Sequence, residues 1–242
     1  MNEQILADWL KNSQYTVIMS GAGMSTESGL PDFRSQNGLW KEKDPSRLAS
    51  IEAMKYHHDD FLSFYRYRLQ ELEKVKPNAG HRLLAEWENQ GIIKSVITQN
   101  VDGLHQKAGS KNIAELHGAI HKIKCHQCST FHEKERFFEG TALCPNCGGF
   151  LRPNVILFGE MLPQQALLFS EKEATHAELF IVLGSSLSVT PAATLPLLAK
   201  QNNAKLVIIN RTETELDGIA DLLIHEKTIG EVLSETAIYL NN

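Results

Sequence analysis

The four cysteines of this chain constrain its fold more than any other feature, because they form two close pairs. Cys125 and Cys128 are separated by two residues, and so are Cys144 and Cys147. Each pair can bind one metal ion from a tight turn, and together the pairs complete the tetrahedral coordination of Zn²⁺. Four thiolates leave no open coordination position, so such a zinc ion stabilises structure and takes no part in catalysis. Two disulfides or four free thiols are the alternatives, but we expect a structural zinc ribbon.

The overall composition is typical of a soluble globular protein. Of the 242 residues, 42% are hydrophobic and 22% are charged, with a net charge of −5 and a pI near 6.1. This acidic balance argues against dedicated binding to nucleic acids or membrane surfaces. The first twenty residues include Glu3, Asp8 and Lys11, unlike a signal peptide, and the longest apolar runs are too short to span a membrane. We therefore expect a cytoplasmic protein with reduced cysteines.

Apolar residues recur with the spacing of a helix or a strand in several parts of the chain. Helical spacing predicts helices over residues 5–10 and 81–88. Four short apolar runs read as strands, at residues 15–19, 92–98, 179–183 and 205–209. Each run ends in small or polar residues, which is typical of a parallel α/β sheet that binds its ligand at the carboxyl ends of the strands.

Two stretches interrupt this alternation and predict a second, smaller module. Residues 38–76 are charged and aromatic without strand-like runs, and residues 121–150 carry the cysteines. We expect these two segments to form a helical and zinc-ribbon module inserted into an α/β domain. That domain would comprise residues 1–37, 77–120 and 151–242. The cleft between the two parts is the expected active site.

A glycine-rich loop follows the first predicted strand. Gly21 and Gly23 match the start of a dinucleotide-binding fingerprint, but Thr26 stands where a third glycine belongs, so this pattern alone also fits a tight turn. The continuation at residues 29–34 adds a carboxylate, an aromatic ring and a guanidinium beside the presumed phosphate site. A simple turn does not need these three groups, and the loop therefore favours a nucleotide site.

Two further motifs carry polar groups suited to a binding site. Gln99, Asn100 and Asp102 follow a predicted strand and could bind ribose hydroxyls and an amide, although a polar loop capped by an aspartate is an equal alternative. His117 precedes Gly118 and lies between the two expected walls of the cleft. Most of the ten histidines are expected to be structural, but this position makes His117 a candidate functional residue.

These motifs occur together in a specific order along the chain. The series is Gly21-Ala-Gly-x-Ser, Gly29-Leu-Pro-Asp-Phe-Arg, Thr98-Gln-Asn-Val-Asp, Leu116-His-Gly, the four cysteines, Val155-Ile-Leu-Phe-Gly-Glu, Gly184-Ser-Ser and Ile209-Asn. The set resembles the sirtuins, which are NAD-dependent protein lysine deacylases, over nearly the whole chain. The resemblance implies a Rossmann-like domain with a small zinc module, NAD as a consumed co-substrate and one structural Zn²⁺.

The resemblance also implies roles for individual residues. His117 would be the general base, and Gln99 and Asn100 would contribute to catalysis by contacting the nicotinamide ribose. Phe33 would lie near the nicotinamide, and Val101 and Asp102 would form the carboxamide pocket. The phosphates and the adenosine ribose would be held by Gly184, Ser185, Ser186 and Asn210. The remaining residues implied for the NAD site are Gly21, Ala22, Gly23, Thr26, Asp32, Arg34 and Ile229.

For the acyl-lysine substrate, the resemblance implies two sets of contacts. Residues 155–160, including Val155, Phe158, Gly159 and Glu160, would pair with the substrate backbone as an added strand. Tyr65 and Arg68 lie three residues apart on a predicted helix, and in the sirtuin branch that removes succinyl and malonyl groups such a pair binds the acyl carboxylate. A solvated helix with an incidental arginine is the alternative. Asp32 departs from that branch, which keeps ordinary deacetylation open.

The implied reaction transfers an acetyl, or also a succinyl or malonyl, group from a protein lysine to ADP-ribose and releases nicotinamide. A protein ADP-ribosyltransferase or an NAD hydrolase using the same site is the closest alternative. A zinc-ribbon module that binds nucleic acid is disfavoured, because Lys and Arg nearly balance Glu over residues 121–150. The expected partners are acyl-lysine segments of proteins, and no oligomeric state is predicted.

Overall fold

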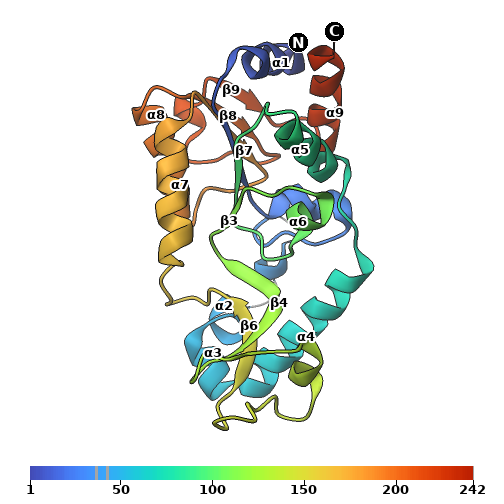
Figure 1. Cartoon of the computed structure of the whole chain (residues 1–242), viewed down its shortest axis with the longest axis vertical. Helices are drawn as coiled ribbons and strands as arrows, with labels where there is room; N and C mark the ends of the chain where they lie inside the picture. The colour runs from blue at the N-terminus through green and yellow to red at the C-terminus, as the bar shows by residue number, and fades with distance from the viewer. Residues whose placement is uncertain (36–37, 42–43, 242) are drawn as a thin grey trace.

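The computed structural model describes residues 1–35, 38–41 and 44–241, and its larger part is built on a six-stranded parallel sheet (Figure 1). The strand order is β3-β2-β1-β7-β8-β9, and every neighbouring pair is parallel. The strands are β1 (Thr16–Ser20), β2 (Ser95–Thr98), β3 (Ile113–Glu115), β7 (Leu179–Leu183), β8 (Lys205–Ile209) and β9 (Leu222–Ile224). The four predicted strands are confirmed, and the two short edge strands β3 and β9 were not predicted.

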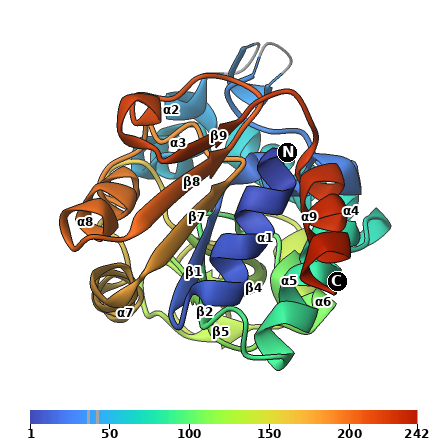
Figure 2. The same cartoon turned by 90° about the horizontal axis from the view of Figure 1, so that it is seen from above.

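Helices cover both faces of this sheet, as seen in Figure 2. One face packs against α1 (Asn2–Asn12), α5 (Ala79–Asn89) and α9 (Ile229–Leu240), and the other against α7 (Gln164–His176) and α8 (Leu195–Gln201). Side chains of a strand alternate between the faces, so Ile18 joins the first core while Val17 and Met19 join the second. Burial on both faces explains why β1 and β7 are apolar almost throughout.

The smaller part of the molecule has an antiparallel sheet and its own apolar core. Its strands are β4 (Gly118–Cys125), β5 (Phe131–His132) and β6 (Leu151–Val155), in the order β5-β4-β6. Three helices pack beside them, namely α2 (Pro45–Leu48), α3 (Ile51–Tyr56) and α4 (His58–Lys74). The side chains of Asp44 and Ser50 cap α2 and α3, which fixes where these helices begin. Residues that are far apart in the sequence therefore share one core, with Phe61 and Leu69 packed among Ile123 and Leu151.

The small sheet extends beyond the segment 121–150 at both ends, because β4 begins at Gly118 and β6 continues to Val155. The predicted boundary at residue 37 lies outside the described residues. The division of the chain into the two predicted domains therefore remains a prediction, although the cores are separate groups of side chains.

The order of the strands reverses at β1, which pairs with β2 on one side and β7 on the other. Open parallel sheets bind ligands at such a switch point, outside the carboxyl ends of the strands. The loop after β1 forms a short 3-10 helix over Ala22–Ser28, and α6 (Leu104–Ala108) lies near the end of β2. No helix in the described part of the chain is long and apolar enough to cross a membrane.

Candidate active site

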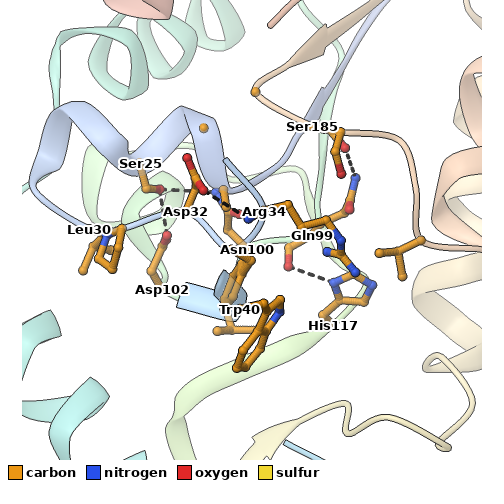
Figure 3. Close-up of a pocket in the computed structure, with 18 of the residues that line it drawn as sticks. Ser25, Leu30, Asp32, Arg34, Trp40, Gln99, Asn100, Asp102, His117 and Ser185 are labelled. Atoms are coloured by element: carbon orange, nitrogen blue, oxygen red, sulfur yellow. Dashed lines mark hydrogen bonds between the residues drawn. The ribbon is translucent and has the colours of Figure 1, made fainter. Parts of the chain in front are cut away.

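A cavity of about 500 Å³ opens at the carboxyl ends of the parallel strands and extends to the small module. Its volume lies in the range of about 300–1,000 Å³ that is usual for ligand pockets. Apart from Gly21, every residue predicted for the NAD or substrate site lines this cavity. The structure thus brings together residues from eight separate stretches of sequence, and Figure 3 shows the central group.

The floor of the cavity is a close contact between two glycine turns, one after β1 and one after β7. Gly184 has a φ of +63°, and a Cβ atom built on it would lie 2.5 Å from the backbone of Gly23 and Met24. A Cβ atom on Gly21 would lie 2.7 Å from the carbonyl oxygen of Gly184. Any larger residue would therefore push the turns apart. Gly21 packs against Gly184 without lining the cavity, whereas Gly23 and Gly184 both line it.

A chain of buried hydrogen bonds connects the glycine loop to the end of β2 (Figure 3). The Ser25 hydroxyl donates to Asp102 Oδ2 at 2.8 Å, and Asn100 Nδ2 donates to the Gly21 carbonyl at 2.9 Å and to Ser25 Oγ at 3.2 Å. The second carboxylate oxygen of Asp102 accepts from the amide of Leu104. These contacts fix Asn100 and Asp102 against the loop, so their positions do not depend on a ligand.

His117 follows β3 and lies beside Gln99, with its Nδ1 atom 3.0 Å from the Gln99 carbonyl oxygen (Figure 3). Because a carbonyl oxygen can only accept, Nδ1 must carry the proton, and in the neutral ring Nε2 is then free to accept one. Burial lowers the pKa of His117 and the charge of Arg34 lowers it further, while the bond to Gln99 opposes them. The imidazole is therefore neutral at neutral pH, as a general base requires.

The other side of the cavity has polar groups at the ends of β7 and β8. Gln99 Nε2 donates to Ser185 Oγ at 2.8 Å, which joins the strand ends across β1. Asn210 Nδ2 donates to the Thr212 carbonyl at 2.7 Å. Ile229 begins α9, whose first turn is fixed by the Glu27 carboxylate accepting from the amide of Gly230 at 2.8 Å. Gln99, Ser185 and Asn210 thus place polar groups along this side of the cavity.

The segment after the glycine loop also lines the cavity. Asp32 accepts from the amides of Arg34 and Ser35 at 3.1 and 2.9 Å, which closes a turn. Phe33 stacks on Trp40 with ring centroids 5.2 Å apart. The two stacked rings form an aromatic part of the cavity lining.

Tyr65 and Arg68 extend from α4 into the same cavity. The Arg68 guanidinium lies 5.1 Å from the centre of the Phe33 ring and 5.7 Å from that of Phe64. Burial raises the pKa of Tyr65 to about 12, so its hydroxyl stays neutral and can donate a hydrogen bond. Burial lowers the pKa of Arg68, with Tyr65 and Asp102 opposing it, but an arginine remains charged at neutral pH.

Residues 155–160 form the rim of the cavity on the side of the small module. Phe158 is 44% exposed, and its amide donates to the Ala49 carbonyl at 2.9 Å. Glu160 is partly buried, and its carboxylate bonds to Arg152 and to the amide of Leu157. The rim is therefore a structured segment with an exposed side.

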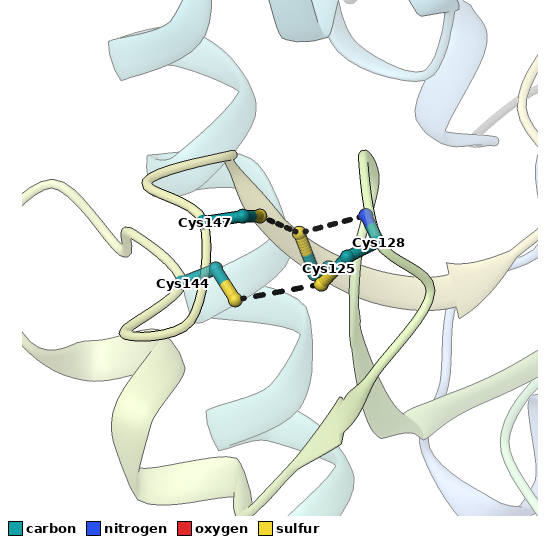
Figure 4. Close-up of side chains that lie close together, drawn as sticks. All are labelled: Cys125, Cys128, Cys144 and Cys147. Carbon is teal, nitrogen blue, oxygen red and sulfur yellow. Dashed lines mark hydrogen bonds between the residues drawn. The ribbon is translucent and has the colours of Figure 1, made fainter.

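The four cysteines form a separate cluster in the small module, well placed for one zinc ion (Figure 4). Their sulfur atoms all lie within 4.8 Å of one another. The Cys125–Cys147 and Cys128–Cys144 sulfur distances are 3.5 and 3.7 Å, close to the edge of about 3.8 Å of a tetrahedron with Zn–S bonds of about 2.3 Å. The donor set and its geometry therefore fit a structural Zn²⁺.

Several residues of the cavity were not assigned from the sequence. Ser25 belongs to a motif that the sequence singled out, but its hydroxyl bond to Asp102 depends on the fold. Trp40 lies in the charged and aromatic stretch, and Val189 and Thr190 follow the serines after β7. Arg152, a charged residue between Leu151 and Pro153 in strand β6, is a signal in the sequence that could have been followed further.

Comparison with known proteins gives a consistent result over nearly the whole length. Residues 21–191 match the model of the Sir2 family. An NAD-dependent protein deacetylase 1 of Geobacillus kaustophilus (strain HTA426) is 52% identical over 231 residues, which cover 95% of both chains. A solved structure of Sir2 with a p53 peptide and NAD+ matches with a TM-score of 0.90 at 39% identity, covering 98% of both chains. Another, with a deacetylated p53 peptide and 3′-O-acetyl-ADP-ribose, matches with a TM-score of 0.91 at 39% identity and the same coverage.

Proposed function

The chain belongs to the Sir2 family, and we propose that it removes acyl groups from protein lysines with NAD as co-substrate. The observation that carries this proposal is the arrangement of His117, a neutral imidazole whose Nε2 atom can accept a proton, beside Gln99 and Asn100 in the cavity. Relatives described as NAD-dependent deacetylases, and Sir2 structures with NAD and a peptide, support the same reaction. The expected products are nicotinamide, the free lysine and an O-acyl-ADP-ribose.

The residues that line the cavity are suited to binding NAD. The two glycine turns bring backbone amides close together at the ends of β1 and β7, where a pyrophosphate can approach the backbone. Gly184, Ser185, Ser186 and Asn210 would hold the phosphates and the adenosine ribose, with Ala22, Gly23, Thr26, Asp32, Arg34 and Ile229 around them. When bound, NAD supplies a ribose carbon that accepts the acyl oxygen as nicotinamide leaves.

At the nicotinamide end, Asn100 and Asp102 are held by Ser25 and the glycine loop. Gln99 and Asn100 would orient the nicotinamide ribose, and Val101 and Asp102 would bind the carboxamide. Phe33, stacked on Trp40, would exclude water from this end of the cavity. His117 Nε2 would take a proton from a ribose hydroxyl, and the Gln99 carbonyl would hold the ring while it does so.

The acyl-lysine would enter between residues 155–160 and the turn after β7, since both line the cavity. We propose that the substrate backbone pairs with part of the 155–160 segment, a mode of recognition that tolerates many sequences. The two predicted domains would form the walls of this entrance. Cysteines that hold zinc must stay reduced, so we propose that the protein works in the cytoplasm.

Dependence of nicotinamide release on an acyl peptide tests the proposal. Acetyl-, succinyl- and longer acyl-lysine peptides are incubated with the enzyme, with and without NAD, and all products are followed by mass spectrometry. We expect nicotinamide and free lysine in equal amounts, and only when both substrates are present. Release of nicotinamide without a peptide would make the protein an NAD hydrolase, and a peptide that gains ADP-ribose would make it a transferase of that group.

A further inference from the structure

Arg152 is a charged residue with no exposed side-chain surface, an arrangement that demands an explanation. Transfer of a guanidinium from water into a protein interior is costly unless hydrogen bonds and an opposite charge compensate. The residue lies in β6, an edge strand whose other residues include Leu151 and Val155. The reason for its burial must therefore be found in the groups that the guanidinium contacts.

The guanidinium of Arg152 binds Glu160 through both of its terminal nitrogens, at 2.6 and 2.8 Å. It also donates to the Val155 carbonyl and, through Nε at 3.3 Å, to its neighbour Pro153. A planar fork facing a carboxylate in this way is the strongest common ion pair in proteins, and Lys cannot reproduce both contacts. The guanidinium therefore makes two hydrogen bonds to the Glu160 carboxylate and two to backbone carbonyls.

Glu160 continues the connection into the rim of the cavity. Its Oε2 atom accepts from the amide of Leu157 at 2.8 Å, and its own amide donates to the Leu157 carbonyl at 2.9 Å. The opposite side of the segment is fixed independently, because the amide of Ile156 donates to the His117 carbonyl at 2.9 Å. The rim is thus connected on one side to the backbone of His117 and on the other to the Arg152–Glu160 pair.

The two contacts of the pair fall on the free edge of β6 and its continuation. Alternate residues of a strand direct their amide and carbonyl groups to the same edge, so Val155 and Leu157 share the edge opposite to Ile156. Arg152 donates a hydrogen bond to the carbonyl group of Val155, and the Glu160 carboxylate accepts one from the amide of Leu157. An unprotected edge of this kind would accept any extended chain. Because the pair bonds both of these backbone groups, an added chain cannot pair with this edge as far as Leu157.

We propose that Arg152 is a positioning residue for the acyl-lysine substrate, acting through Glu160. This role rests on the proposed function. Glu160 would hold the rim and would not contact the substrate. The amide of Phe158 donates to the Ala49 carbonyl, so with the edge closed at Val155 and Leu157 the exposed Gly159, which lines the cavity, is left as the place where a substrate backbone can pair. The register of the bound peptide, and so the depth at which its acyl-lysine enters, would be set by the pair.

Steady-state kinetics with an acetyl-lysine peptide and NAD test this role. Arg152→Met removes the fork, and we expect the KM for the peptide to rise roughly 10-fold or more. The KM for NAD should stay within about threefold of wild type, because the residues implied for NAD lie elsewhere. Arg152→Lys keeps one charged contact to Glu160 and should restore most of the peptide affinity. Equal changes in both KM values would overturn the positioning role.

Glu160→Gln gives a milder variant in case Arg152→Met folds poorly, and it allows a double-mutant cycle. If the two residues act as one unit, the double variant should have a peptide KM no higher than that of the worse single variant. Additive effects would show that they act separately and would contradict the proposal.

Arg66→Met is the matched control. The Arg66 guanidinium also bonds backbone carbonyls of the small module, those of Phe137 and Gly140, but it does not contact the rim. This variant should lose thermal stability while its peptide KM stays within about twofold of wild type. A peptide KM that rises as much as in Arg152→Met would reduce Arg152 to a purely structural residue.

Hydrogen exchange of the ligand-free protein separates this inference from the proposed function. The amide of Leu157 should exchange faster in Arg152→Met and in Glu160→Gln, and unchanged protection in both would overturn the inference whether or not the enzyme is active. If the Leu157 amide exchanges faster in both variants but the wild-type protein removes no acyl group, the proposed function fails. The pair then holds the rim for another ligand. Faster exchange with an unchanged peptide KM would refute positioning of the substrate.

Discussion

At the scale of single residues, one backbone contact determines what His117 can do. The Gln99 carbonyl fixes the proton on Nδ1, so the neutral ring presents Nε2 as an acceptor. The sequence could identify His117 by its place between the expected walls of the cleft. It could not show the contact to Gln99, because the two residues meet only when β2 and β3 pair. Arg152 was visible in the sequence as a charge within β6, but its bond to Glu160, eight residues further on, depends on how the chain turns after that strand.

The pKa of His117 leads to a pH prediction. Burial lowers this pKa below its ordinary value of about 6.5. The ring therefore loses its proton at a lower pH than usual, and the base form is complete at neutral pH. We expect kcat/KM to be flat around pH 7 and to fall with acid through a limb centred below pH 6.5. The pH profile measures this directly, and a limb assigned to His117 but centred above pH 7 would contradict the environment described.

Arg68 allows a test of acyl selectivity. If it binds an acyl carboxylate, Arg68→Met should lower kcat/KM for succinyl-lysine about 10- to 150-fold, the equivalent of roughly 1.5–3 kcal/mol for a lost charged contact. The acetyl group has no carboxylate, so its kcat/KM should stay within a few-fold. The ratio of the two values cancels general damage to the fold. Equal losses, or a wild type without activity on succinyl-lysine, would leave a plain deacetylase with a structural Arg68.

At the scale of elements, long periodic segments were predictable and short ones were not. β7 and β8 have the predicted bounds, and α1 and α5 contain the predicted helical segments. β3 and β9 have three residues each, too few to show a period, and they exist because a neighbouring strand offers a free edge. β2 begins at Ser95, later than its apolar run, because the preceding residues connect it to the end of α5.

The four-cysteine cluster joins β4 to the turn before β6. Cys144→Ser leaves three thiolates and an incomplete site, so the variant should lose its zinc and most of the stability of the small module. Zinc content measured by atomic spectroscopy and the midpoint of thermal unfolding test the prediction together. A variant that loses zinc and keeps both its thermal midpoint and its activity would show that the metal is not structural.

At the scale of the whole molecule, function depends on bringing two cores to one cavity. The strand order reverses at β1, and the glycine turns meet there, so the nucleotide end of the cavity follows from the topology of the sheet. Sequence patterns indicated a parallel sheet and an inserted module. They could not give the order of the strands or show that Phe61 and Leu151 share a core, because such contacts join distant parts of the chain.

If His117 is the base of NAD-dependent deacylation, as we propose, its replacement by alanine should nearly abolish the reaction, and a comparison of His117→Ala with wild type measures this. Both proteins are incubated with an acetyl-lysine peptide and NAD, and the deacetylated peptide is quantified by mass spectrometry, with circular dichroism and NAD affinity as controls for folding and binding. We expect wild type to produce free lysine, nicotinamide and O-acetyl-ADP-ribose in equal amounts. The folded variant should form free lysine about 10²–10⁴-fold more slowly. Near-normal turnover in a folded His117→Ala protein would show that His117 is not the general base.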